Sequence, residues 1–136
     1  IKDKLNIINE LFNANNIYDI VETLKIEATN HEHQLKQKIA QQSLKAIEKS
    51  SPLSIRIIYE QLKRGKEMTS LKDVFIMEHI LSQHFMDQSD FFEGVRALLI
   101  DKDQSPSFIY KNINDVSDDV VNKFFIPSKN YIPLKF

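Results

Sequence analysis

The residues of this sequence best suited to chemistry lie together in "DFFEGVRALLIDKDQSP", residues 90–106. Asp101, Lys102 and Asp103 stand side by side there. Carboxylates beside an ammonium could act as an acid–base pair, and the lysine alone could bind a phosphate. The same three residues could also do no more than end a helix. Lys102 follows the predicted helix, so it can either reach a phosphate or remain in water.

A second candidate is the sequence "HEH" at residues 31–33, because imidazole and carboxylate groups bind zinc. On a helix, however, positions i and i+2 point about 200° apart, so His31 and His33 cannot share one ion. No third ligand is clustered with them in the sequence. We therefore interpret this segment as a solvated helix start and predict no metal site.

The other polar candidates also favour structural roles. His79 and His84 are five residues apart on one predicted helix and should point in different directions. Glu78 and His79 could be an acid–base pair only if another part of the chain brought a substrate to them. The basic cluster "KRGKE" at 63–67 lies at a helix end, where cations complement the helix dipole, and a phosphate contact is the alternative. No nucleophile is supported by a motif, so no catalytic residue is assigned.

The elements that must position these residues are helices. Apolar residues recur at helical spacing along almost the whole chain, and strand-like alternation is scarce. This pattern predicts an all-α fold of about six to seven amphipathic helices. The expected helices cover residues 1–12, 17–27, 31–49, 52–65, 71–87, a segment starting at 89 or 90, and 118–125.

Local signals predict where several helices begin and end. Asn16, Ser51, Ser70 and Ser117 are expected N-caps, and Pro52 suits the first position after Ser51. Ser89 or Asp90 is expected to cap the helix that follows, and Glu93 is placed to complete a capping box from Asp90. Gly65 is expected to end its helix in a left-handed conformation.

Apolar stripes facing the core are predicted on most of these helices, and two of them bear on the candidate residues. One contains Phe92, Val95 and Leu99; Gly94 lies inside this helix at a cost of up to ~1 kcal/mol relative to alanine, unless another backbone or a ligand comes close. The other stripe lies on the helix that follows Pro52 and consists of Ile55, Ile58, Tyr59 and Leu62.

Composition limits the classes of function. A chain of 136 residues suits one domain, 1–136, and its net charge of −1 argues against nucleic acid or an acidic membrane as partner. The sequence has no cysteine and no apolar run near the ~18 residues of a membrane span. Only two glycines are present, too few for phosphate-binding loops or backbone oxyanion holes, which indicates a scaffold. The chain opens with Ile1 and not Met, so we expect that the true N-terminus has been removed or lies in a larger parent protein.

The stretch 90–106 resembles the C-terminal signature of the 3-hydroxyisobutyryl-CoA hydrolase family, a branch of the crotonase (enoyl-CoA hydratase/isomerase) superfamily. "SPLSIRIIYEQLKRG" at 51–65 is similar to the Ser-Pro-x-Ser helix of that family, and "SLKDVFIMEHILSQHFM" at 70–86 to its next helix. Residues 51–106 thus carry the family signature. Residues 1–50 form less specific helices, and 107–136 a short helix with an irregular tail.

The resemblance implies that this chain is the C-terminal helical portion of such an enzyme, without the glycine-rich crotonase core and without catalytic residues. The parent would hydrolyse a branched 3-hydroxyacyl-CoA thioester in mitochondrial valine breakdown, with no cofactor. Acyl-CoA would then be a partner through the missing core, and these helices would pack over its site or form homo-oligomer contacts. Lys102 is the nearest match to a family lysine that approaches CoA phosphate, with an offset of one residue. Ser107 and Phe108 replace the basic–aromatic pair of the family.

Two alternatives remain open. One is a related enoyl-CoA hydratase or isomerase, which only the acidic residues of the core would distinguish from the hydrolase. The other is a non-catalytic module derived from a crotonase and reused for assembly, such as a component of the mitochondrial ribosome. Intact acidic and oxyanion-hole motifs upstream would favour an enzyme, and their loss would favour assembly.

Overall fold

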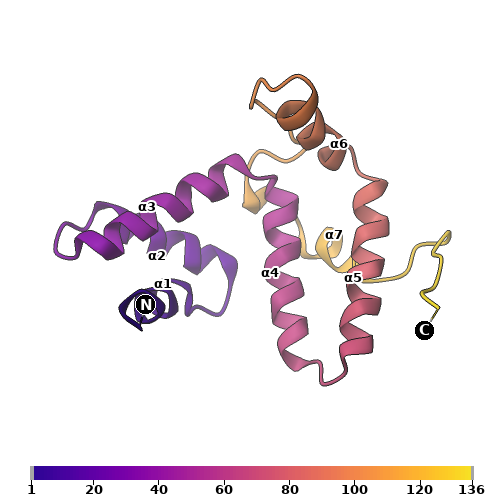
Figure 1. Cartoon of the computed structure of the whole chain (residues 1–136), viewed down its shortest axis with the longest axis horizontal. Coiled ribbons are helices and arrows are strands. Elements are labelled where there is room, and N and C mark those ends of the chain that lie inside the picture. The colour runs from indigo at the N-terminus through magenta and orange to yellow at the C-terminus, as the bar shows by residue number, and fades with distance from the viewer. Residues whose placement is uncertain (1, 136) are drawn as a thin grey trace. The chain divides into compact units, whose positions relative to one another are not determined.

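The computed structural model describes residues 2–135, and in this range all regular elements are helices (Figure 1). The prediction of an all-α fold is therefore confirmed; Ile1, which was expected in the first helix, lies outside the described residues. The α-helices are α1 (Lys2–Phe12), α2 (Ile17–Thr29), α3 (Gln34–Lys49), α4 (Pro52–Glu67), α5 (Leu71–Met86), α6 (Ser89–Val95) and α7 (Asp118–Lys123). A π-helix, η1 (Arg96–Ile100), continues α6, and a 3₁₀ turn, η2 (Ile113–Asp115), precedes α7. Among the described helices, none is long and apolar enough to cross a membrane.

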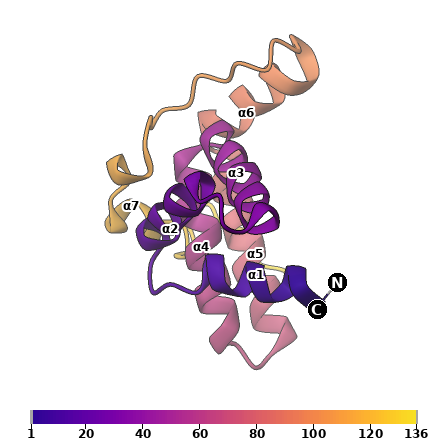
Figure 2. The same ribbon diagram turned by 90° about the vertical axis from the view of Figure 1, so that its left-hand side faces the viewer.

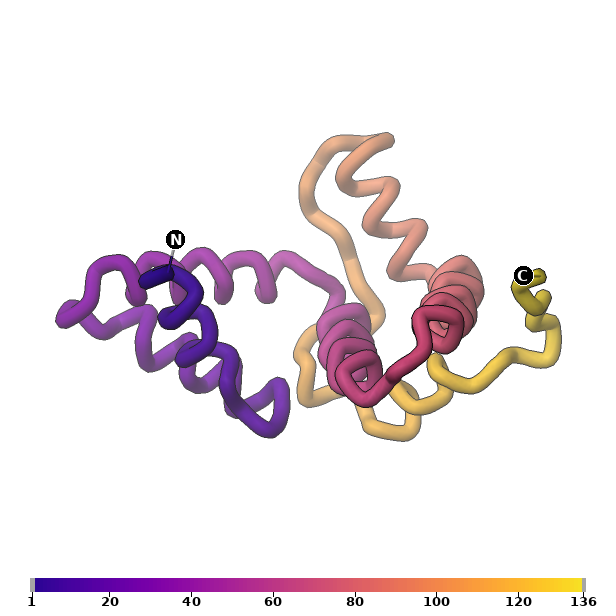
Figure 3. Tube along the Cα trace, turned by 60° about the horizontal axis from the view of Figure 1, so that its bottom comes forward, coloured from indigo at the N-terminus to yellow at the C-terminus, as the bar shows by residue number. Residues whose placement is uncertain are grey.

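The chain divides into two compact units, Ile1–Ser50 and Ser51–Phe136. In the first unit α2 and α3 form an antiparallel hairpin, and α1 packs against both (Figure 3). The ammonium of Lys36 on α3 forms ion pairs with Glu10 of α1 at 3.2 Å and with Glu27 of α2 at 3.1 Å. This lysine therefore links the three helices of the unit.

The second unit is built on the antiparallel pair α4 and α5, with α7 packed against them (Figures 1 and 2). Its core joins residues from both ends of the unit's sequence. The buried members of this core are Leu53, Ile57, Met77, Leu81, Val116, Val121 and Phe124. Since α7 contributes to the core, the segment between α6 and α7 has to return to the α4–α5 pair.

The predicted start of α4 is confirmed, and its predicted end is wrong. Ser51 accepts a hydrogen bond from the Ser54 N–H, and Pro52 is the first helical residue. The helix continues through Gly65 to Glu67, and Gly65 has no positive φ. An extended residue, Met68, ends the helix instead, with its N–H bonded to the Gly65 carbonyl.

The apolar stripe predicted on α4 is also wrong in part. Ile58 and Leu62 are exposed, whereas Leu53 and Ile57 are almost completely buried. Helical spacing shows which residues share a face, but two adjacent faces of α4 both carry apolar residues. Packing against α5 and α7 selects the face with Leu53 and Ile57 as the core of this unit.

Candidate functional site

The candidate site begins at α6, where the predicted capping box is absent. Gln88 occupies the N-cap position, so Asp90 lies inside the first turn. The Asp90 side chain is buried and accepts hydrogen bonds from the Ser51 hydroxyl at 2.6 Å and from the Ile109 N–H at 2.9 Å. Asp90 therefore connects the start of α4, the start of α6 and the chain that returns toward α7.

The helix that contains the chemical candidates changes type before it ends. At η1 the Asp101 N–H donates to the Arg96 carbonyl at 2.8 Å, which is the i to i+5 spacing of a π-helix. The next residues form a loop in which Lys102 and Gln104 have left-handed φ angles of 58° and 56°. Such angles are uncommon for residues other than glycine, so the surrounding contacts must stabilise this loop.

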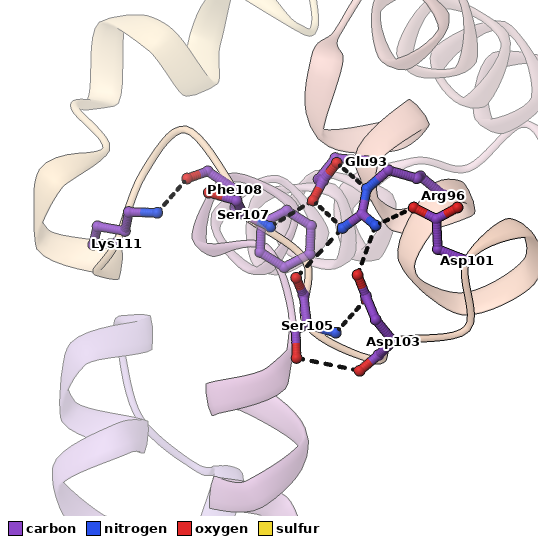
Figure 4. Close-up of polar contacts among 8 residues, drawn as sticks. All are labelled: Glu93, Arg96, Asp101, Asp103, Ser105, Ser107, Phe108 and Lys111. Atoms are coloured by element: carbon purple, nitrogen blue, oxygen red, sulfur yellow. Dashed lines mark hydrogen bonds and ion pairs between the residues drawn. The ribbon is translucent and has the colours of Figure 1, made fainter.

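Those contacts converge on Arg96, the centre of a carboxylate network (Figure 4). Its guanidinium forms a two-point pair with Glu93, in which both hydrogen bonds are 2.8 Å long. The Nη1 atom donates to Asp101 at 2.6 Å and to Asp103 at 2.7 Å. The Nη2 atom also lies 3.5 Å from the Ser105 carbonyl oxygen. The five N–H donors of an arginine are thus directed at the residues around it.

Backbone donors complete the network. The Ser107 N–H donates to Glu93 at 2.8 Å, and the Ser105 N–H donates to Asp103 at 2.8 Å. Hydrogen bonding to Arg96 and then to Ser107 lowers the pKa of Glu93 from 4.5 to about 2. Arg96 likewise lowers the pKa of Asp103, and the carboxylates raise the pKa of Arg96. Glu93 and Asp103 are therefore poor proton carriers at neutral pH, and their role here is to hold the loop.

This geometry separates the three residues that the sequence places together. Asp101 and Asp103 both face Arg96, so they do not form an acid–base pair with Lys102. Lys102 is exposed, and its ammonium forms no hydrogen bond or ion pair with any residue in the described range 2–135. The hypothesis that Lys102 contacts a phosphate stays a prediction.

Two of the predicted core positions in this segment are wrong. The side chains of Phe92 and Leu99 are exposed, and only Val95 of the predicted stripe is half-buried. Ala97, which the stripe did not include, is completely buried. An alanine contributes little to a hydrophobic pattern, so only the packing shows that Ala97 is buried.

The segment "HEH" lies before α3 and not within it. His33 is the N-cap residue of α3, which begins at Gln34, and its side chain makes no capping hydrogen bond. The His31 Nδ1 atom lies 3.1 Å from the Gln37 amide nitrogen. No group of three or more histidine, cysteine, aspartate or glutamate side chains in the described part of the chain could hold a metal ion.

His79 and His84 both contact the chain that follows α7. The Nε2 atom of His79 lies 2.8 Å from the Ile132 carbonyl oxygen, and that of His84 lies 2.8 Å from the Ile126 carbonyl oxygen. A carbonyl only accepts hydrogen bonds, so each imidazole donates through Nε2. These histidines hold the C-terminal segment against α5.

A groove of about 440 Å³ lies beside His79. The Ser82 hydroxyl in this groove donates to the backbone carbonyl of His79 at 2.8 Å, and not to its imidazole. Serine and histidine therefore do not form a nucleophile–base pair here. The groove is lined by His79, Ser82, Gln83, Met86, Asp87, Ser128, Asn130 and Ile132.

The basic cluster at 63–67 contributes to packing through Arg64. Its guanidinium lies 4.0 Å from the centre of the Phe125 ring and donates to Glu60 at 2.7 Å and to Asn122 at 2.6 Å. Because these partners come from both α4 and α7, Arg64 joins the two helices. A phosphate ligand is not needed to explain this arginine.

Comparisons with known proteins agree on one family. The family model described as enoyl-CoA hydratase/isomerase matches residues 1–125. The mitochondrial 3-hydroxyisobutyryl-CoA hydrolase of Dictyostelium discoideum is 39% identical over 134 residues, which are 98% of this chain and 33% of that protein. The proteins of the same name from Gallus gallus and Homo sapiens are 44% and 38% identical, over 90% and 92% of this chain and 30% of each relative. The chain thus spans about one third of the length of these relatives.

Solved structures share the fold. The crystal structure of an enoyl-CoA hydratase from Rhodobacter sphaeroides matches with a TM-score of 0.80 and 30% identity, over 97% of this chain and 36% of that one. A carnitinyl-CoA dehydratase from Mycobacterium thermoresistibile matches with a TM-score of 0.76 and 22% identity, over 96% and 35% of the two chains. The second similarity concerns the fold alone. In both, a helical arrangement of this kind is part of a chain almost three times as long.

Proposed function

The chain belongs to the enoyl-CoA hydratase/isomerase family, and from this premise we propose that it is the C-terminal helical region of a mitochondrial 3-hydroxyisobutyryl-CoA hydrolase. The observation that carries the proposal is the 38% to 44% identity to relatives of that name over 90% or more of the chain. In the parent reaction, which belongs to valine breakdown, water adds to the thioester carbonyl carbon. The carbon–sulfur bond then breaks and releases the free acid and CoA.

We assign the chemistry of this reaction to residues outside the chain. Glu93 and Asp103 are held ionised by Arg96, and the imidazoles of His79 and His84 donate to backbone carbonyls. None of these groups is arranged to activate water. The helical region would instead pack over the acyl-CoA site or form contacts between subunits.

Lys102 is the residue that we propose contacts the substrate, through a phosphate of CoA. It is exposed in a loop whose two aspartates, Asp101 and Asp103, are bound by Arg96. An ammonium on a fixed loop binds a phosphate at a smaller entropic cost than one on a mobile loop. Replacing Lys102 by glutamine in the longer enzyme should raise KM for acyl-CoA several-fold with little change in kcat. The same change at Lys111, whose ammonium donates to the Phe108 carbonyl, is the control.

The proposal is tested by measuring turnover of 3-hydroxyisobutyryl-CoA by two proteins. One is the 136-residue chain alone. The other is a longer protein in which a crotonase-type core precedes this chain. We expect CoA release only from the longer protein. Turnover by the purified chain would contradict the assignment of catalysis to the core. Hydration of an enoyl-CoA without thioester hydrolysis would support the hydratase alternative.

That alternative, an enoyl-CoA hydratase or isomerase, rests on the structural match at 30% identity to the Rhodobacter sphaeroides enzyme. The helical region would have the same positioning role in either enzyme. The acidic residues of the core would then decide whether water attacks the thioester carbonyl or the double bond. A longer protein that turns over neither substrate would instead support an assembly role.

A further inference from the structure

We propose that Arg96 is a positioning residue for Lys102: it binds the carboxylates on both sides of Lys102 and so leaves the lysine ammonium available to an anionic ligand. Only the identity of this ligand, a phosphate of CoA, rests on the function proposed above. The arrangement itself follows from contacts within residues 93–105.

The first observation is that both neighbours of Lys102 converge on one atom. Asp101 and Asp103 accept hydrogen bonds from the same nitrogen, Nη1 of Arg96, at 2.6 and 2.7 Å (Figure 4). Two carboxylates next to a lysine in sequence are natural ion-pair partners for its ammonium. In this loop they pair with the arginine, and Lys102 has no such partner in residues 2–135.

The second observation is the backbone conformation of the loop. Lys102 and Gln104 are both left-handed, and they alternate with the two aspartates. Left-handed residues other than glycine cost free energy, so this loop would relax without compensating contacts. The compensation comes from Arg96, which contacts the side chains of Asp101 and Asp103 and lies 3.5 Å from the Ser105 carbonyl oxygen.

The third observation concerns charge. Glu93, Asp101 and Asp103 would together carry three negative charges, and Arg96 reduces this total to −2. Without the guanidinium, a phosphate that approached Lys102 would meet three uncompensated carboxylates and a lysine already paired with its neighbours. Arg96 therefore acts on Lys102 through the aspartates, and it needs no contact of its own with the ligand.

The test is the rate at which an amine-specific reagent labels Lys102 in the 136-residue chain, read by mass spectrometry. An ammonium in an ion pair reacts more slowly than one in water. We expect Arg96→Gln to slow the labelling of Lys102 several-fold, because Asp101 and Asp103 can then pair with it. Adding Asp101→Asn and Asp103→Asn to this variant should restore the wild-type rate. Lys111 serves as the internal control in each sample.

A purely structural role for Arg96 gives a different result. If Arg96→Gln only disorders the loop, Lys102 should be labelled at the wild-type rate or faster. Adding Asp101→Asn and Asp103→Asn to that variant would then restore nothing. Either outcome overturns the proposal. The slowing should also weaken at high salt, since salt screens an exposed ion pair and does not refold a loop. Circular dichroism checks that each variant keeps its helices. If Arg96→Gln loses them, Asp101→Asn/Asp103→Asn with Arg96 intact is the remaining test, and a Lys102 rate more than twofold from wild type in this variant overturns the proposal.

This experiment uses no CoA, so its failure would leave the proposed hydrolase function untouched. Conversely, a longer protein without hydrolase activity would leave the labelling result valid. If the hydrolase function and the positioning role of Arg96 are both correct, Arg96→Gln in the longer enzyme should raise KM for acyl-CoA as Lys102→Gln does. The two aspartate substitutions should reverse the effect of Arg96→Gln and not that of Lys102→Gln.

Discussion

The Ser51 hydroxyl donates a 2.6 Å hydrogen bond to the buried Asp90 carboxylate, although the two residues are 39 positions apart in sequence. Ser51 also accepts from the Ser54 N–H as the N-cap of α4, and Asp90 also accepts from the Ile109 N–H. The pair therefore joins α4, α6 and the returning loop at one point. It lies within the two sequence segments that most resemble the hydrolase family.

Removing either partner should destabilise the second unit. We expect Asp90→Ala to lower the free energy of unfolding by about 2 kcal/mol, because a charged acceptor of two hydrogen bonds is lost. Ser51→Ala should cost about 1 to 2 kcal/mol, through the lost cap and the lost donor to Asp90. Urea unfolding of each variant measures both changes. Ser50→Ala is the matched control, and equal effects at Ser50 and Ser51 would contradict the assigned role.

The pKa of Glu93 predicts a pH dependence of stability. Arg96 and the Ser107 N–H lower this pKa from 4.5 to about 2 in the folded protein. A lowered pKa means that the ionised carboxylate stabilises the fold; this contribution is complete above pH 4.5 and is lost as the pH falls toward 2. Glu93→Gln should flatten the loss of stability in this window, whereas Glu48→Gln on α3 should not. A Glu93 carboxyl that titrates near 4.5 by NMR would refute this prediction.

Gly94→Ala should stabilise the chain, although Gly94 belongs to the family signature. A methyl group added at Gly94 meets no atom within 4 Å, and this glycine has no positive φ. Alanine is better than glycine inside a helix by up to ~1 kcal/mol. Gly65→Ala on α4, where the nearest atom to the added methyl is the Met77 Cε at 4.0 Å, provides a matched comparison. Thermal unfolding measures both, and a destabilised Gly94→Ala chain would contradict the structure.

The same substitution probes the parent protein. If Gly94→Ala stabilises the chain but lowers the activity of the longer enzyme, another segment must approach Gly94 there. Equal activity would show that the glycine is dispensable for packing.

Exposed apolar side chains on α6 and η1 predict self-association of the chain. Phe92, Leu98, Leu99 and Ile100 are 54% to 69% exposed within ten residues. Apolar patches beyond a few hundred Å² are rare on monomers and usually mark interaction surfaces. Light scattering should show a mass that increases with concentration, and Leu98→Gln/Leu99→Gln/Ile100→Gln should reduce it. A monomer at all concentrations, with little dye binding, would count against this surface.

Local signals were sufficient to predict the all-α class and the starts of four helices. Asn16, Ser51, Ser70 and Ser117 each cap the helix predicted from them, since a cap side chain and the backbone N–H that donates to it lie within four residues. The all-α class and the family signature also followed from the sequence. The expected stop at Gly65 failed because glycine permits a left-handed conformation and does not require one.

Only the tertiary structure decided what the chemical candidates do. The sequence places Asp101, Lys102 and Asp103 in a row, but the fold turns both aspartates to Arg96 and leaves Lys102 outside their network. In the fold the Asp90 side chain also accepts hydrogen bonds from Ser51 and Ile109, and it does not cap its own helix. Helix signals act over a few residues, whereas these partners depend on a π-turn and on contacts across the unit. Residue types determine which interactions a side chain can make, and the path of the backbone determines which of them form.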